Sequence, residues 1–175
     1  QEQIDKAYEQ IEDAFPNLIT NLANHPGIGF VLVKPHRMEN IKFEICCGSL
    51  QSALNAQEAG ARRVELCSAL SLGGLTPSYG FIELARKRLK IDINVLIRPR
   101  QGDFLYDSDE VAVMIRDITA CAQMGVNGVV IGALDPFGNV DEDACRAMVA
   151  VAKHHGMSVT FHRAIDRACN IMEAL

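Results

Sequence analysis

The sequence lacks a long apolar run, a basic stripe and a secretory leader, and these absences narrow the class of protein. Its 175 residues include 17 basic and 22 acidic side chains, a formal net charge of −5. An acidic chain without a basic stripe is not a general nucleic-acid binder. No apolar run approaches the roughly 20 residues that cross a bilayer, and the opening QEQIDKAYEQ is too polar for a signal peptide. We expect a cytoplasmic globular protein with no nucleic-acid or membrane partner.

Cysteine is present, but not in the patterns that mark disulfide frameworks or zinc ribbons. The chain has six cysteines and no Cys-x-x-Cys pair, which weakens zinc-ribbon and thioredoxin-like interpretations. Nothing marks secretion, and a chain of this length can build a core without disulfides. Cys121, Cys145 and Cys169 fall on expected helices, and we expect them to be small buried apolar side chains or to have no role in a site. Cys46 and Cys67 differ from these three, because each ends an expected strand.

A dinucleotide-binding fingerprint is also missing, since no G-x-G-x-x-G follows a strand. A regular alternation of strand and helix patterns begins instead near residue 43. Expected strands span 43–47, 63–67, 93–98, 128–132 and 158–162, and expected helices span 49–59, 79–90, 108–124 and 141–155. Gly60, Gly125 and Gly156 each follow a helix, as cap glycines do, and Asp107 with Glu110 predicts a capping box. Strand–helix–strand units at this spacing predict an α/β fold with a parallel sheet.

The residue alternation along the strands favours a barrel over an open sheet. One face of each expected strand is apolar, as in Val64 with Leu66 and Val95 with Ile97. The other face carries polar and thiol side chains, whereas an open sheet covered on both sides has two apolar faces. A polar inner face at the carboxyl ends of the strands is typical of a barrel active site. We therefore expect a TIM-type (β/α) barrel.

The chain has room for only part of such a barrel. We expect truncation after about five of the eight strands that close a TIM barrel. The first and fifth strands would then have open edges, which favour self-association. We expect a homo-oligomer, and light scattering that finds a monomer would contradict this. Residues 1–37 form an extra segment whose origin the sequence leaves open, with a helix expected over 1–15 and a strand over 28–33, and the barrel-like domain spans 38–175.

A Glu-x-Cys pattern ends each of the first two expected strands. Glu44 and Cys46 share the inner face of one strand, and Glu65 and Cys67 share that face of the next. Adjacent strands lie about 4.8 Å apart, so the two thiols can reach one soft ion, Cu(I) or zinc, unless stagger offsets them by a layer. The alternative is that both cysteines merely fill space inside the barrel.

Two buried glutamates need partners, because an unpaired buried carboxylate is costly. Arg98 and Arg100 at the end of the third expected strand can supply them. Two interpretations stay open: a purely structural glutamate–arginine network, and a site for an anionic small molecule. The loop 101–106 is either a lid or binding loop, or an ordinary surface loop.

His162 ends the fifth expected strand on the inner face. It is the candidate acid–base or ligand histidine, with a hydrogen-bonded structural histidine as the alternative. Asp166 can orient this ring or cap the next helix. Glu44, Glu65 and His162 together form a set suited to acid–base catalysis on a small phosphorylated or carboxylated compound.

Five segments, FEICC, RRVELCSALSLGGLTPS, VLIRPRQGDFLY, GVVIGAL and VTFHRAID, together resemble the CutC family of copper-homeostasis proteins. The resemblance covers roughly residues 38–175 and implies a TIM-type barrel, a cytoplasmic protein linked to copper handling, and Cu(I) bound at two cysteines that match Cys46 and Cys67. Compared with the family, we expect this chain to lack strands six to eight of the barrel and to carry residues 1–37 as an addition. The polar strand-end residues shared by the family match Glu44, Glu65, Arg98, Arg100, Asp103, His162, Arg163 and Asp166.

Two functional hypotheses follow, and whether the chain is an enzyme stays open. The first is copper homeostasis through Cu(I) bound by the strand-end cysteines. The second is a TIM-barrel enzyme for a small anionic substrate, in which the three acid–base candidates are catalytic and the other strand-end polar residues bind the substrate. A third possibility is an inert fragment. Thiol-dependent metal binding separates the first two, and a cooperative thermal transition separates both from the third.

Overall fold

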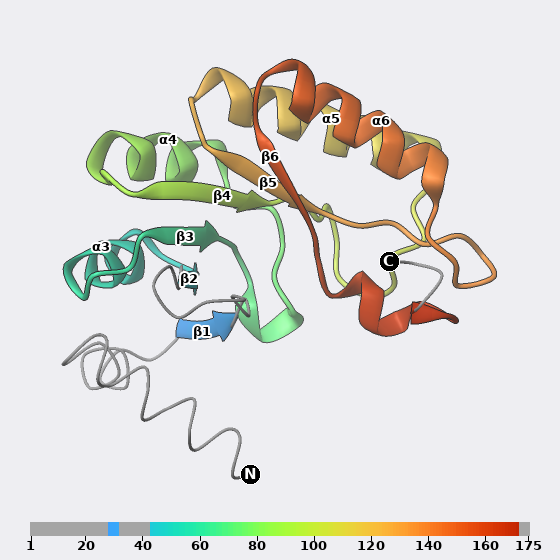
Figure 1. Cartoon of the computed structure of the whole chain (residues 1–175), viewed down its shortest axis with the longest axis horizontal. Helices are drawn as coiled ribbons and strands as arrows, with labels where there is room; N and C mark the ends of the chain where they lie inside the picture. The colour runs from blue at the N-terminus through green and yellow to red at the C-terminus, as the bar shows by residue number, and fades with distance from the viewer. Residues whose placement is uncertain (1–27, 32–42, 172–175) are drawn as a thin grey trace, which may run out of the picture.

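The fold alternates strands and helices along the chain (Figure 1). The structure is a computed structural model, and it describes residues 28–31 and 43–171. The elements are β1 (Ile28–Val31), β2 (Glu44–Cys47), α3 (Leu50–Glu58), β3 (Arg63–Leu66), η2 (Leu70–Leu72), α4 (Tyr79–Arg88), β4 (Asp92–Leu96), α5 (Ser108–Gln123), β5 (Gly128–Ile131), α6 (Glu142–His154), β6 (Ser158–Phe161) and η3 (Arg163–Arg167). The helix predicted over 1–15 and the boundary predicted between 37 and 38 lie outside the described residues.

The described strands form one sheet in the order β1-β2-β3-β4-β5-β6. From β2 to β6 every neighbouring pair runs parallel. A doubly wound sheet reverses its strand order, whereas a barrel adds each strand beside the one before it. The order therefore confirms the predicted α/β fold, with five parallel strands arranged as in part of a (β/α) barrel.

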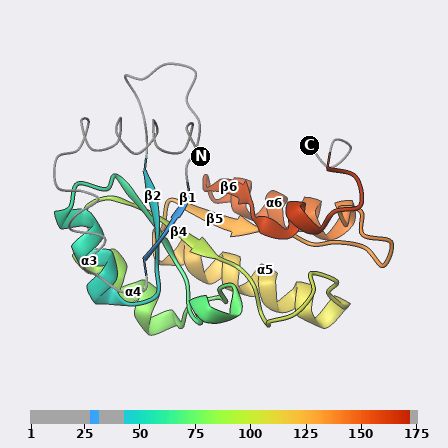
Figure 2. The ribbon, with the colours of Figure 1, turned by 90° about the horizontal axis from the view of Figure 1, so that it is seen from below.

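The strand β1 joins the sheet on the side of β2. It pairs antiparallel with β2, so that Gly29 lies opposite Cys46 and Val31 opposite Glu44. Figure 2 shows the two strands together. The prediction that the first parallel strand has an open edge is wrong, because the β1 backbone occupies that edge. On the other side, β6 is the last strand of the sheet.

The two faces of the sheet carry different cores, as the alternation predicted. Between the sheet and the helices lies the main core, in which Met114 of α5 and Met148 of α6 are fully buried. Its fully buried strand residues are Ile45, Cys47, Val64, Leu66, Ile93, Val95, Val129 and Ile131. The opposite face holds a smaller cluster of Cys67, Leu96 and Val130, against which Cys46 and Leu70 pack. The thiols predicted for the inner face are therefore on it.

Local signals at the helix ends are confirmed as well. Asp107 and Glu110 form the predicted capping box at the start of α5, and the glycines after α3, α5 and α6 have positive φ.

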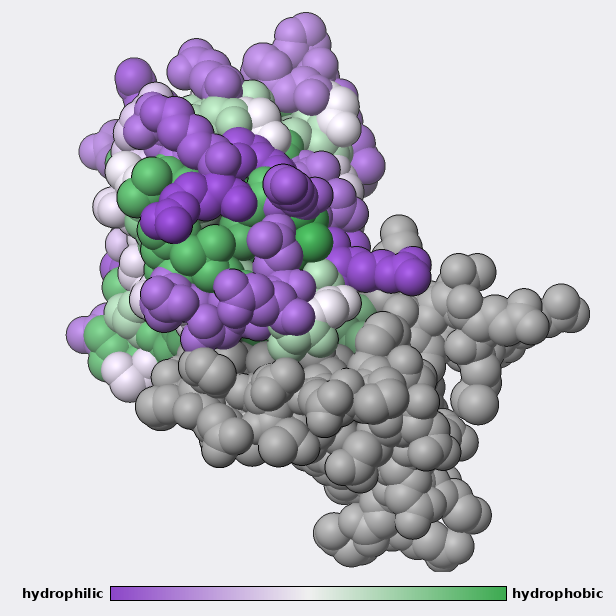
Figure 3. All heavy atoms as spheres, turned by 90° about the vertical axis from the view of Figure 1, so that its left-hand side faces the viewer, coloured by the Kyte–Doolittle hydropathy of each residue, from purple (hydrophilic) through white to green (hydrophobic). Residues whose placement is uncertain are grey.

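On the side of α3 and α4, hydrophilic side chains border a smaller apolar area (Figure 3). Within the described ranges, every helix is too short or too polar to span a bilayer.

Candidate functional site

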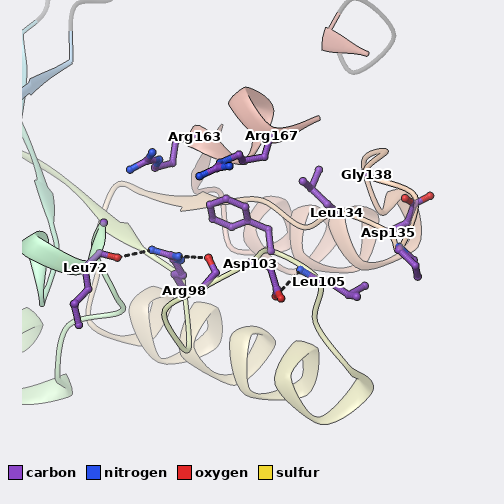
Figure 4. Close-up of a pocket in the computed structure, with 13 residues that line it drawn as sticks. Leu72, Arg98, Asp103, Leu105, Leu134, Asp135, Gly138, Arg163 and Arg167 are labelled. Carbon is purple, nitrogen blue, oxygen red and sulfur yellow. Dashed lines mark hydrogen bonds between the residues drawn. The ribbon is translucent and has the colours of Figure 1, made fainter. Parts of the chain in front are cut away.

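A pocket opens at the carboxyl ends of the parallel strands, where sites of (β/α) barrels lie. Its volume is about 710 Å³, and its walls come from the segments that follow β3, β4, β5 and β6 (Figure 4). Next to this pocket, on the inner face of β2 and β3, lies a cluster of thiols. The predicted site residues are divided between these two places.

Cys46, Glu65 and Cys67 form the thiol cluster. One ligand atom from each residue lies within 4.8 Å of the other two, and the Cys67 thiol donates to Glu65 Oε1 at 3.3 Å. The register places Cys46 opposite Glu65, so the strands are staggered and the two cysteines are diagonal neighbours. The predicted approach of the two thiols is thus present, with a carboxylate as a third donor.

The pKa values of Glu65 and Cys67 are raised, so these two groups hold their protons more tightly than they would in water. Desolvation raises the pKa of Glu65 to about 7, and the nearby Glu44 carboxylate adds to the increase, whereas the hydrogen bond from Cys67 opposes it. The interaction with Cys46, together with burial, raises the pKa of the Cys67 thiol far above its ordinary value. A metal ion must displace protons to bind here, so metal affinity should increase with pH.

Glu44 has partners other than the predicted ones. Its carboxylate forms an ion pair with Arg63 and accepts a hydrogen bond from Asn94 Nδ2 at 2.7 Å. The prediction that Arg98 or Arg100 balances this glutamate is wrong, because the register places Arg63 directly opposite Glu44. Glu44 is also the first residue of β2, at the strand end away from the pocket.

Arg98 is held by backbone carbonyls rather than by a carboxylate. The side chain is 5% exposed and donates to the carbonyls of Leu72, Gly74 and Gly102 at 3.2, 3.1 and 2.8 Å. Its Cζ lies 4.9 Å from the centroid of the Phe104 ring, a cation–π contact. These contacts fix the guanidinium group at the edge of the pocket.

Arg100 also has partners other than Glu44 and Glu65. It pairs with Asp103 at 2.9 Å and with Glu110 in the first turn of α5. The loop predicted as a lid is therefore fastened to α5 through Arg100. The hypothesis of an internal network joining these arginines to Glu44 and Glu65 does not fit the contacts that the arginines make.

His162 is buried beside the pocket. Its Nδ1 accepts the backbone N–H of Ala164 at 3.2 Å and so caps η3, while Nε2 has no hydrogen-bond partner in the described part of the chain. Burial lowers the pKa of His162 to about 4, and the charges of Arg98 and Arg163 contribute to the decrease. The ring is therefore neutral near pH 7, with its proton on Nε2.

Of the remaining predicted residues, two line the pocket and one does not. Arg163 lines the pocket, and Asp103 lines it while paired with Arg100. Asp166 is exposed on η3. It does not orient His162, because the ring is held by a hydrogen bond with the backbone N–H of Ala164.

The sequence analysis missed Arg167, which lines the pocket one helical turn after Arg163, and the turn formed by Gly73 and Gly74. Both glycines have a φ of 86°. A Cβ on Gly74 would lie 2.7 Å from Leu96 Cδ2 and 3.9 Å from Cys67 Sγ. This turn separates the thiol cluster from the pocket, and the Gly-Gly dipeptide was the available signal for it.

The histidine makes the stability of the protein depend on pH. Its pKa is about 6.5 in an unfolded chain and about 4 in the fold, so between these values the unfolded chain binds the extra proton. Acidification from about pH 6.5 to about pH 4 should therefore lower the free energy of unfolding, by up to about 1.4 kcal/mol per pH unit. His162→Asn keeps a capping acceptor and should remove this slope.

Urea unfolding of the parent protein and the His162→Asn variant across that pH range tests this prediction. Glu65 titrates with the opposite sign, because its pKa is raised, but it contributes to both proteins and cancels in the difference. A difference that stays constant with pH would show that His162 titrates normally in the fold.

A family model and curated relatives both match this chain to proteins named CutC. The family model described as CutC matches residues 41–175. A family protein CutC of Vibrio atlanticus (strain LGP32) is 48% identical over 128 residues, which cover 73% of this chain and 52% of that protein. One of Xylella fastidiosa (strain 9a5c) is 55% identical over 123 residues, 70% of this chain and 45% of that protein. This chain spans about half the length of these curated relatives.

A solved structure is similar as well. It is the crystal structure of a Streptococcus agalactiae protein named for copper homeostasis, CutC, with a TM-score of 0.67 and 34% sequence identity. The match covers 71% of this chain and 60% of that one.

Proposed function

This chain belongs to the CutC family, and from that premise we propose that it binds Cu(I) in copper homeostasis. Cys46 and Cys67 are the main ligands, and Glu65 is a third donor. The observation that carries this proposal is the convergence of the three donors within 4.8 Å. Thiolates select Cu(I) and zinc, whereas hard ions prefer oxygen.

The dimensions of the cluster suit a soft ion. Metal–sulfur bonds of about 2.3 Å allow two sulfur ligands of one ion to lie up to about 4.6 Å apart, and the three donors lie within 4.8 Å of one another. Three protein donors do not complete the four-coordinate shell of a structural zinc site. Cu(I) accepts two or three ligands, so this donor set favours Cu(I).

The surroundings favour the same ion. Cys67 is 1% exposed and packs with Leu96 and Val130 on the inner face of the sheet. An apolar shell limits the access of water and oxidants to a bound ion. Cys47 does not compete for the ion, since it is fully buried in the main core on the opposite face.

The test is an anaerobic titration of the reduced protein with Cu(I) against a competing chelator. We expect one tight site, and we expect the Cys46→Ala/Cys67→Ala double variant to bind at least about 100-fold more weakly, because it loses both thiolate ligands. Cys121→Ser is the matched control, since Cys121 is also 1% exposed but lies on α5, outside the cluster.

Binding that survives in the double variant would refute the proposal, as would binding lost in the Cys121→Ser control. Zinc that binds more tightly than Cu(I) in a parallel titration would refute the choice of ion.

A further inference from the structure

The pocket at the strand ends has a positive wall that the copper proposal does not use. Arg98, Arg163 and Arg167 all line it. Arg98 bonds to carbonyls, and none of the three arginines forms an ion pair with another residue of the described ranges. Their positive charges therefore have no ion-paired protein counter-charge there.

The carboxylates in the pocket are already engaged. Asp103 pairs with Arg100 at 2.9 Å. Asp135 accepts the backbone N–H groups of Phe137 and Asn139, at 2.8 Å each, within its own turn. Neither carboxylate bonds to an arginine of the positive wall, so the wall stays available to a ligand.

Two of the guanidinium groups approach the same point of the backbone. A Cβ on Gly73 would lie 3.1 Å from Nη1 of Arg98 and 3.5 Å from Nη1 of Arg163. Like charges this close repel one another, and an anion between them would turn the repulsion into attraction. In Figure 4, Arg163 and Arg167 extend from η3 in the same direction.

We propose that this pocket binds the phosphate group of a small phosphorylated organic molecule. Arg163 and Arg167 are exposed and free to form paired N–H···O bonds with it, the geometry in which arginine recognises oxyanions. Arg98 is the fixed positive charge behind them. Three positive charges favour a doubly charged group, which a phosphate monoester supplies near neutral pH and a single carboxylate does not.

The rest of the pocket suits the organic part of such a molecule. Leu72, Phe104 and Leu134 line it beside the arginines. A volume of about 710 Å³ is far larger than a free phosphate ion requires and lies in the usual range of small-molecule pockets. Because Arg98 is held by three carbonyls and stacked on Phe104, it is positioned before the ligand arrives, which lowers the entropy lost on binding.

The proposal is tested by calorimetric titration of the full chain at constant ionic strength. The probes are glycerol 3-phosphate, inorganic phosphate and malonate, a dicarboxylate of similar charge. We expect saturable binding of glycerol 3-phosphate, with weaker binding of the other two. Arg163→Gln and Arg167→Gln should each weaken it about 10- to 100-fold, the range for a lost charged hydrogen bond.

Arg116→Gln is the matched control, because it removes the same charge from an exposed position on α5 that lies outside the pocket. If Arg116→Gln and Arg163→Gln weaken the binding of glycerol 3-phosphate equally, the net charge of the protein alone explains the effect, and the proposal is overturned. Malonate that binds more tightly than glycerol 3-phosphate would overturn the assignment to phosphate, and no saturable binding of any probe would overturn the site.

The outcome is independent of the copper proposal. The Cys46→Ala/Cys67→Ala variant should bind glycerol 3-phosphate as the parent does, and Arg163→Gln should bind Cu(I) as the parent does. A thiol variant that loses phosphate binding would show that the pocket is not a separate site.

Discussion

Replacing Arg63 with methionine should lower the free energy of unfolding by about 3 kcal/mol, the lower end of the range for breaking a buried ion pair. The Glu44 side chain is 5% exposed, and Arg63 is its counter-charge. Without Arg63 the carboxylate retains only the Asn94 hydrogen bond, and Glu65 lies near enough to repel it. We expect the lower end of the range for a buried ion pair because the Arg63 side chain is 24% exposed, so water can partly solvate the Glu44 carboxylate once Arg63 is gone.

The double variant Glu44→Gln/Arg63→Met is the control for this prediction. It removes both charges, and replacement of a whole buried pair is often close to neutral, so most of the lost stability should return. Urea unfolding near neutral pH measures both proteins. A single variant within about 0.5 kcal/mol of the parent, as expected of an ordinary surface substitution, would show that this pair contributes little.

Gly74→Ala should be the second strongly destabilising change. Its positive φ of 86° costs an L-residue about 1–2 kcal/mol. The new Cβ would also lie 2.7 Å from Leu96 Cδ2, and overpacking of this kind typically adds about 1–3 kcal/mol. Because Leu96 packs with Cys67 in the inner cluster, the displacement should also weaken Cu(I) binding.

Gly60→Ala separates the two contributions. Gly60 has a φ of 94° and nothing within 4 Å of a Cβ, so its replacement should lose only the backbone part, about 1–2 kcal/mol, and leave Cu(I) binding intact. Thermal and urea unfolding of both variants give the comparison. If both variants lose the same free energy of unfolding, the contact between the new Cβ at position 74 and Leu96 is relieved without a cost in stability.

The features that the sequence predicted well are those set by neighbours along the chain. The alternation of Val64 and Leu66 with Glu65 assigns each to a face, because successive side chains of a strand point to opposite sides. The capping box of Asp107 and Glu110 is contained in four residues. Strand order followed from the regular spacing of these local signals.

The partners of charged groups could not be predicted in the same way. Glu44 meets Arg63 because of the register between β2 and β3, which the pattern of one strand does not specify. Arg98 bonds to the carbonyls of Leu72, Gly74 and Gly102, whose placement depends on backbone turns such as that of Gly73 and Gly74. The thiol cluster was predictable because the repeated Glu-x-Cys motif puts soft donors on the same face of adjacent strands.

The agreement of strand order with chain order also has a consequence for how the molecule is assembled. Each parallel strand pairs with the strand that precedes it in the chain, so each pairing closes a shorter loop, at a lower entropy cost, than a pairing between strands far apart in sequence. The two candidate sites would then be completed at different times during synthesis. The donors of Cys46, Glu65 and Cys67 are in place once β3 has joined β2, whereas the pocket waits for Arg163 and Arg167 at the end of the described chain.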